Sequence, residues 1–169
     1  QGIISKIREE QQIPEFDDEG NKIYINIDGF PHFPVERNHA IPFIEKLIEY
    51  GADPLMEIDK KGSFYKKLLA VDSEAMAQYV LDKVDNKTLF SIDARGIDWL
   101  GYILENKASK SFDVFVKEKE DVIEFNKNYV LMAEQNLLHL SMANYLTNES
   151  GYLIVKGTSL TQRGYQGSY

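Results

Sequence analysis

The sequence has no cysteine, and this absence removes disulfide bonds, thiolate catalysis and cysteine-ligated metal sites in one step. It also has no run of about 18 consecutive apolar residues, the length that a membrane-spanning helix needs. We therefore expect a soluble protein without membrane insertion. A cytoplasmic location is favoured, and an exported form is left open because the chain starts at Gln1 and not at Met.

Basic residues are in the minority, since 19 Lys and Arg stand against 27 Asp and Glu, which gives a net charge of −8. A chain of this sign repels phosphate backbones, so nucleic acid is not an expected ligand. Electrostatics instead favours a basic protein as the partner.

Sequence motifs of active sites are missing as well. There is no Gly-x-Gly-x-x-Gly, no Gly-x-Ser-x-Gly and no phosphate-binding loop ending in Gly-Lys-Ser/Thr. The histidines His32, His39 and His139 do not have the spacing of metal ligands, and the acidic run at 17–19 lacks the alternating oxygens of a calcium loop. We predict no catalytic residue, no metal and no cofactor, and we do not expect a small-molecule ligand.

A repeated turn divides the chain into similar units. Asp stands shortly before Gly at 28–29, 59–62 and 93–96, so that these glycines recur at intervals of 33 and 34 residues. Periods of 20–50 residues are typical of solenoids. The 169 residues, 43% of them hydrophobic, suit a single domain built from such units.

Helical spacing of apolar residues follows each turn. Gly51 is suited to end a helix with a positive φ, and Ser73 is suited to cap the start of one. The expected helices cover 33–37 and 42–50 in the first unit, 64–71 and the residues after Ser73 in the second, and 99–104 and 112–119 in the third.

Residues 47–54, Leu-Ile-Glu-Tyr-Gly-Ala-Asp-Pro, resemble the end of an ankyrin repeat, whose second helix runs into a Gly-Ala-Asp turn. Residues 136–141 resemble the Thr-Pro-Leu-His-x-Ala centre of the same motif through Leu138 and His139, which implies a structural role for that histidine. The resemblance covers roughly residues 28–145 and requires an insertion near 120–130. It implies a mostly α fold, an ankyrin-like α-solenoid of three to four helix-pair repeats, in which residues 55–61 would be the extended finger that projects toward the following repeat.

The two ends do not follow the repeat. We expect an N-terminal cap over residues 1–27, with a helix at 3–12 and a strand at 23–27, ahead of the repeats at 28–150. Residues 151–169 are expected to form a short strand at 151–155 and a flexible tail. Atypical, partly β-containing termini are what a solenoid needs to cover its outermost units.

The resemblance implies a non-catalytic protein-binding module that uses its finger tips and the exposed side of the first helix of each pair. The sharper hypothesis is an inhibitor or immunity-type protein that masks a basic partner, and the alternatives are an assembly segment of a larger protein and, less favoured, an enzyme. Tyrosines are expected to be the anchors of the interface. The expected partner-binding residues are Met56, Glu57, Asp59, Lys61, Tyr65, Ser91, Asp93, Arg95, Asp98 and Tyr102.

Overall fold

The computed structural model describes residues 24–25, 33–34 and 40–160, and this part of the chain is mostly helical. The α-helices are α2 (Ala40–Glu49), α3 (Phe64–Leu68), α4 (Glu74–Lys83), α5 (Asn86–Leu89), α6 (Trp99–Glu105), α7 (Ser109–Lys119), α8 (Leu137–Ala143) and α9 (Thr147–Val155). The other elements are the 3-10 helices η1 (Leu69–Val71), η2 (Glu120–Val122) and η3 (Val130–Met132), and the strands β1 (Tyr24–Ile25), β2 (Phe33–Pro34), β3 (Glu57–Asp59) and β4 (Gly62–Ser63).

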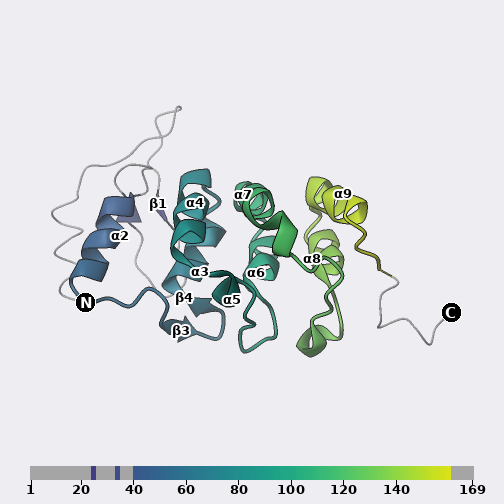
Figure 1. Cartoon of the computed structure of the whole chain (residues 1–169), viewed down its shortest axis with the longest axis horizontal. Helices are drawn as coiled ribbons and strands as arrows, with labels where there is room; N and C mark the ends of the chain where they lie inside the picture. The colour runs from purple at the N-terminus through teal and green to yellow at the C-terminus, as the bar shows by residue number, and fades with distance from the viewer. Residues whose placement is uncertain (1–23, 26–32, 35–39, 161–169) are drawn as a thin grey trace.

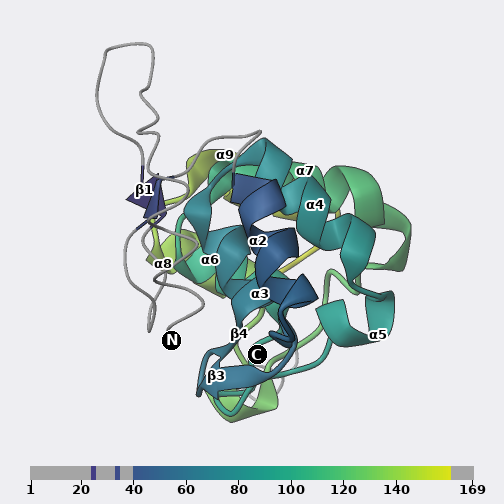
Figure 2. The same ribbon diagram turned by 90° about the vertical axis from the view of Figure 1, so that its left-hand side faces the viewer.

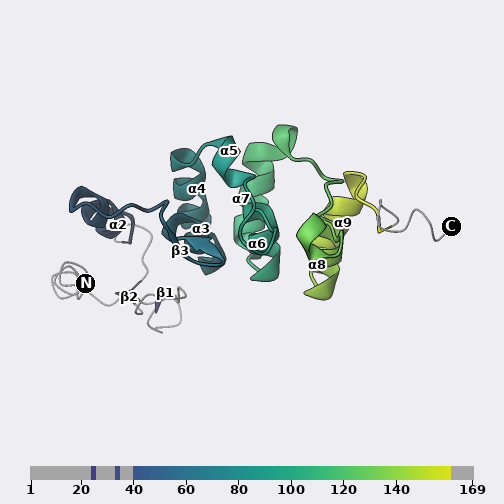
Figure 3. The same ribbon diagram turned by 90° about the horizontal axis from the view of Figure 1, so that it is seen from below.

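The helices stack in single file along the molecule (Figure 1). An outer row consists of α2, α4, α7 and α9, and an inner row of α3, α6 and α8 lies beside it, so that Figure 3 shows the pairs as successive layers. The outer helices begin at Ala40, Glu74, Ser109 and Thr147, at intervals of 34, 35 and 38 residues. The predicted α-solenoid is confirmed, and the longer last interval contains the insertion expected near 120–130.

Each inner helix starts at the same kind of cap. Ser63, Asp98 and Asn136 precede α3, α6 and α8, and each side chain accepts a hydrogen bond from the backbone N–H three residues later. Such a cap satisfies an N–H group that the helix itself cannot pair and is worth about 1 kcal/mol. The repeated cap fixes the position of each inner helix relative to the loop before it.

The turn between the two helices of a pair has a left-handed residue in every described pair. Asp72, Lys107 and Tyr145 occupy it with φ of 63°, 55° and 58°. Glycine is the residue that takes this conformation without strain, and its absence here is why the boundary between paired helices is weak in the sequence. The backbone nevertheless makes the same turn three times.

The core lies between successive pairs. Helix α4 packs along α7, and α8 packs against both α6 and α9. The predicted apolar face of the third unit is confirmed, since Trp99, Leu100, Ile103 and Leu104 are all buried. Burying a Leu or Phe side chain contributes about 1.5–3 kcal/mol, so each layer is stabilised mainly by its neighbours.

Several local predictions are confirmed and two are wrong. Ser73 caps α4, and Gly51 ends the turn after α2 with a φ of 104°. The helix predicted at 33–37 is wrong over Phe33–Pro34, which is strand β2 paired antiparallel with β1. The strand predicted at 151–155 is also wrong, because these residues form the second half of α9. The predictions for 3–12, His32, His39 and the tail from 161 lie outside the described residues.

Three loops project from the inner edge of the solenoid, and we call them finger 1 (residues 55–63), finger 2 (residues 91–97) and finger 3 (residues 129–135). Finger 1 is the hairpin of β3 and β4, as the predicted finger at 55–61 requires. Finger 3 is closed by a bridge between Tyr129 and Gln135 and contains η3. Figures 1 and 2 both show the three loops on the same side of the inner helices.

No helix in the described ranges is long and apolar enough to cross a membrane.

Candidate interaction surface

The finger tips expose a row of large apolar side chains. Met56 is 64% exposed on finger 1, and Leu131 is 65% exposed on finger 3. Single exposed apolar residues are ordinary on a protein surface, but a contiguous set marks an interaction site. We call this set the finger row, and its members are Leu55, Met56, Ile58, Ile92, Val130 and Leu131.

Fingers 2 and 3 touch each other where Gly96 meets Leu131. A Cβ atom built on Gly96 of finger 2 would lie 2.5 Å from Cβ of Leu131 on finger 3. Gly96 also has a φ of 90°, so two independent constraints require glycine here. The close approach holds finger 2 against finger 3.

Two consecutive lysines of α3 hold fingers 1 and 2 from below. The Nζ of Lys67 donates to Asp59 on finger 1 at 2.8 Å, and the Nζ of Lys66 donates to Asp93 on finger 2 at 3.0 Å. Both lysine side chains are almost fully buried, at 2% exposed or less. Buried lysines are rare unless paired, so these contacts are structural anchors of the fingers.

The Asp93 carboxylate is the centre of a larger charged network. It accepts hydrogen bonds from Lys66, from the Arg95 guanidinium at 2.8 Å and from the backbone N–H of Ile97. Arg95 in turn makes a bidentate pair with Glu105. Burial alone would raise the pKa of Asp93, but the donors from Arg95 and Lys66 outweigh it and hold that pKa below its ordinary value of 3.8.

Finger 3 is held by an aromatic hydroxyl instead of a lysine. The Tyr129 hydroxyl donates to Asp98 at 2.7 Å, and the same carboxylate oxygen caps α6 by accepting from the N–H of Gly101. Burial raises the pKa of Asp98 above its ordinary value, although both hydrogen bonds act in the opposite direction. The anchors explain how polar residues fix the backbone beneath an apolar surface.

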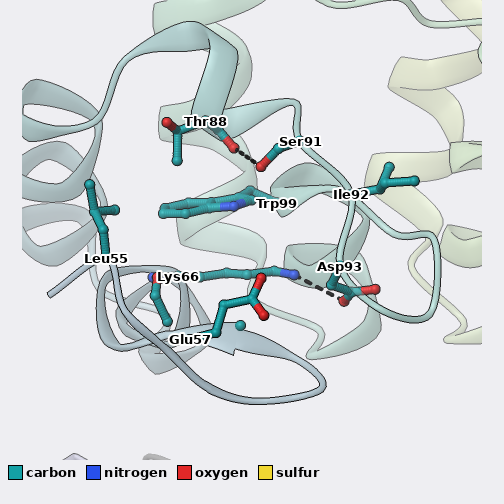
Figure 4. Close-up of a pocket in the computed structure, with 10 residues that line it drawn as sticks. Leu55, Glu57, Lys66, Thr88, Ser91, Ile92, Asp93 and Trp99 are labelled. Carbon is teal, nitrogen blue, oxygen red and sulfur yellow. Dashed lines mark hydrogen bonds and ion pairs between the residues drawn. The ribbon is translucent and has the colours of Figure 1, made fainter.

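A small cleft separates fingers 1 and 2 (Figure 4). Its volume of about 70 Å³ is far below the roughly 300–1,000 Å³ of a typical ligand pocket. Figure 4 shows the Trp99 ring between Thr88 and Ser91 on one side and Lys66 on the other. The lining residues are Leu55, Glu57, Gly62, Ser63, Lys66, Thr88, Ser91, Ile92, Asp93 and Trp99.

The structure divides the ten predicted binding residues into an exposed and a buried group. Arg95 is half-buried in its ion pairs. The exposed members are Met56, Glu57, Asp59, Lys61 and Ser91, all on or beside fingers 1 and 2.

Four of the predicted binding residues are buried, and their predicted exposure is wrong. The hydroxyl of Tyr65 lies 3.1 Å from that of Tyr79 in the core, and the Tyr102 ring lies 5.0 Å from the Nζ of Lys66. Asp93 and Asp98 are buried as anchors. A side chain that is covered within its own chain cannot anchor a partner in this conformation, so the tyrosines are core residues.

Sequence reasoning found Met56 and missed the other members of the finger row. Ile92 comes directly before the Asp-Ala-Arg-Gly turn, and Val130 and Leu131 lie in a stretch that has no Asp-Gly turn. An apolar residue beside a predicted turn is the signal that would have found Ile92. Finger 3 had no such signal, because its turn uses Ala133 and Glu134 in left-handed conformation.

Comparisons with known proteins agree with this architecture at the level of the fold. The ankyrin repeat domain of Bcl-3, described as a unique member of the IkappaB protein family, superposes with a TM-score of 0.57 over 78% of this chain at 14% identity. The chain has the ankyrin-repeat fold. It spans 57% of the length of the Bcl-3 ankyrin domain. The human ASB11 ankyrin repeat domain is also similar, with a TM-score of 0.43 and 10% identity over 73% of this chain and 67% of that one.

No protein-family model and no curated protein sequence matches the chain. The ankyrin-repeat fold is therefore carried by the backbone arrangement and not by sequence identity. The described residues contain no group of three or more His, Asp or Glu that could hold a metal ion. His139 has a structural role, because its Nδ1 accepts the N–H of Asn136 at 3.0 Å and completes the cap of α8.

Proposed function

We propose that this chain binds another protein through the finger row. The observation that supports the proposal is that three neighbouring fingers each carry exposed apolar side chains and are each held in place by a polar anchor. A rigid, preformed apolar surface loses little conformational entropy on binding, which favours affinity. Exposed charged residues beside the row, such as Glu57 and Lys61, supply the polar rim of such an interface.

We further propose that the partner protein is basic. The net charge of −8 favours it, and an inhibitor or immunity-type protein that masks a basic protein is the more specific form. Association driven by such charges slows as ionic strength rises, because salt screens the attraction. The association rate measured between 50 mM and 500 mM salt distinguishes this form from a purely apolar contact.

The finger row is tested by removing two of its members. We expect Ile92→Ser with Leu131→Ser to weaken binding of the partner recovered from the native source by at least about tenfold, since central apolar anchors carry most binding energy. Calorimetric titration of the purified partner measures the loss. Val122→Ser, at an exposed apolar site on η2, is the control and should change affinity less than about twofold.

Thermal unfolding of the three proteins separates binding from folding. The double variant should melt close to the unaltered chain, because both side chains are already exposed. Unchanged affinity in the double variant at a normal melting temperature would contradict the proposal.

The last helix pair favours a second candidate function, an assembly segment that takes a further layer of helices. Leu69 and Leu104 stand six positions after the caps of α3 and α6, and both are fully buried. Met142 stands at the same position after the cap of α8, yet it is 47% exposed. The sixth position after the cap is therefore still apolar in α8, although no described residue covers Met142.

The outer row of helices also has a position that is buried in the earlier pairs and exposed in the last pair. Leu81 and Val116 stand at the eighth position of α4 and α7 and are buried, whereas Ile154 at the eighth position of α9 is 58% exposed. Solenoids usually end in a unit with a polar outer face. The apolar face of α8 and α9 therefore fits another helix pair of the same kind in a longer polypeptide.

This second candidate is tested with Met142→Gln and Ile154→Gln together. In the 169-residue chain we expect the free energy of unfolding to change by less than about 0.5 kcal/mol, because both sites are exposed. In the polypeptide as it occurs naturally we expect a loss of about 2–4 kcal/mol, because the same side chains would be buried there. Urea unfolding measures both, and equal effects in the two proteins would contradict an added layer.

A further inference from the structure

The cleft between fingers 1 and 2 has room for the end of one side chain. A buried water needs about 10–15 Å³, so 70 Å³ accommodates roughly five to seven heavy atoms. That is the size of a guanidinium group with one or two methylenes. The cleft lies within the finger row, with Leu55 on one wall and Ile92 on the other, so that a protein lying across the fingers would cover it.

The charges inside the cleft are already paired, and the charge at its mouth is not. Lys66 and Asp93 neutralise each other at 3.0 Å, and Asp93 also accepts from Arg95. Glu57 lines the same cleft on the exposed strand β3, and its side chain makes no hydrogen bond or ion pair with any residue that the structure describes. The cleft therefore offers one carboxylate that no described residue pairs.

The remaining lining suits a flat cation on an apolar stem. Trp99 lines the cleft but is only 5% exposed, so any contact of a guanidinium with its indole is limited to that exposed part. The hydroxyls of Ser91 and Thr88 add polar atoms, while Leu55 and Ile92 can contact methylenes. An acidic side chain would instead meet the unpaired carboxylate of Glu57.

We infer that this cleft binds an arginine side chain of the partner protein, with the guanidinium on the Glu57 carboxylate and the aliphatic stem between Leu55 and Ile92. The inference rests on the proposed function, since it names the chemistry that the partner brings to the finger row. It also names Glu57 as one place where the net negative charge of the chain would contact a basic partner.

The experiment uses n-butylguanidine as a stand-in for the arginine side chain. The chain has a single tryptophan, Trp99, so its indole N–H gives one resolved NMR signal that reports directly on the cleft. We expect n-butylguanidine to shift this signal with half-saturation at about 1–10 mM, the range for a ligand of this size. At equal ionic strength n-butylamine should bind more weakly and butyrate should cause no saturable shift.

Two variants decide whether Glu57 is responsible. Glu57→Gln should weaken n-butylguanidine about tenfold, because it removes a charge-assisted hydrogen bond while leaving the shape of the cleft. Glu118→Gln removes the same charge at an exposed position on α7 and should leave the titration unchanged. A Glu57→Gln titration equal to that of the unaltered chain, or a shift with butyrate as large as that with n-butylguanidine, would overturn the inference.

The n-butylguanidine titration and the finger-row experiment test two different proposals, so one proposal can be rejected while the other is kept. Loss of partner binding in the Ile92→Ser and Leu131→Ser variant together with no response to n-butylguanidine would keep the proposed function and reject the arginine cleft. The reverse pair of results would reject the finger row as the docking surface.

Discussion

Replacing Asp93 with alanine is expected to lower the free energy of unfolding by about 3–5 kcal/mol, the range for removing one partner of a buried ion pair. The substitution leaves the Lys66 ammonium almost fully buried without its carboxylate. It also removes acceptors for the backbone N–H groups of Arg95 and Ile97, which shape finger 2. Urea unfolding followed by far-UV circular dichroism measures the loss.

Lys66→Met is the control that separates the buried charge from the packing. Methionine fills a similar volume, and Asp93 keeps the guanidinium of Arg95 and its backbone donors. We expect a loss of about 1 kcal/mol or less, because no charge is then left unpaired. A loss as large as that of Asp93→Ala would show that Lys66 acts through packing and not as the partner of Asp93.

The Asp93 contribution should also depend on pH in a defined direction. The pKa of Asp93 is held below its ordinary value of 3.8 in the folded chain, so the unfolded chain binds the proton more readily. The stability that Asp93 supplies is therefore present above about pH 4 and is lost as pH falls through the folded pKa. The difference between the unaltered chain and Asp93→Ala should shrink below pH 4.

Local signals in the sequence predicted the course of the chain well. The Ser73 cap and the Gly51 turn depend on residues within one helical turn of each other, so a short stretch of sequence contains all the information they need. The period of 33–34 residues between glycines likewise predicted the stacking, and the structure shows nearly the same interval between outer helices.

Burial across layers could not be predicted in the same way. Lys66 and Lys67 read as surface residues, because lysine is usually exposed and the Asp93 partner of Lys66 is 27 positions further along the chain. The sequence pattern predicts Tyr65 and Tyr102 at the surface. The spacing of residues along one helix does not show which side of that helix the neighbouring layer covers. Exposure on an inner helix is a property of the assembled solenoid and not of one repeat.

Asp98→Ala is expected to cost about 2–4 kcal/mol, the second-largest effect among these predictions. About 1 kcal/mol comes from the lost cap of α6, and the rest comes from leaving the buried Tyr129 hydroxyl without an acceptor. Gly101 keeps this site open, because a Cβ there would lie 3.1 Å from the Tyr129 hydroxyl oxygen. The hydroxyl therefore has little room to find another partner.

Asp98→Asn should retain most of that stability, because its amide oxygen can accept the same two hydrogen bonds. Asn136 already caps α8 in this way at the corresponding position. We expect the free energy of unfolding to stay within about 1 kcal/mol of the unaltered chain at pH 5. A loss equal to that of Asp98→Ala would contradict the view that the acceptor, and not the negative charge, is what the fold requires.

The negative charge on Asp98 should lower the free energy of unfolding as pH rises. Burial raises the pKa of Asp98 above 3.8, so the folded chain holds this proton more tightly than the unfolded chain. The stability contributed by protonated Asp98 is present below the ordinary pKa and is lost as pH rises through the folded one. Asparagine has no proton to lose, so Asp98→Asn should gain stability relative to the unaltered chain as pH rises from about 4 through the folded pKa of Asp98, and urea unfolding over a pH series gives the sign of the change.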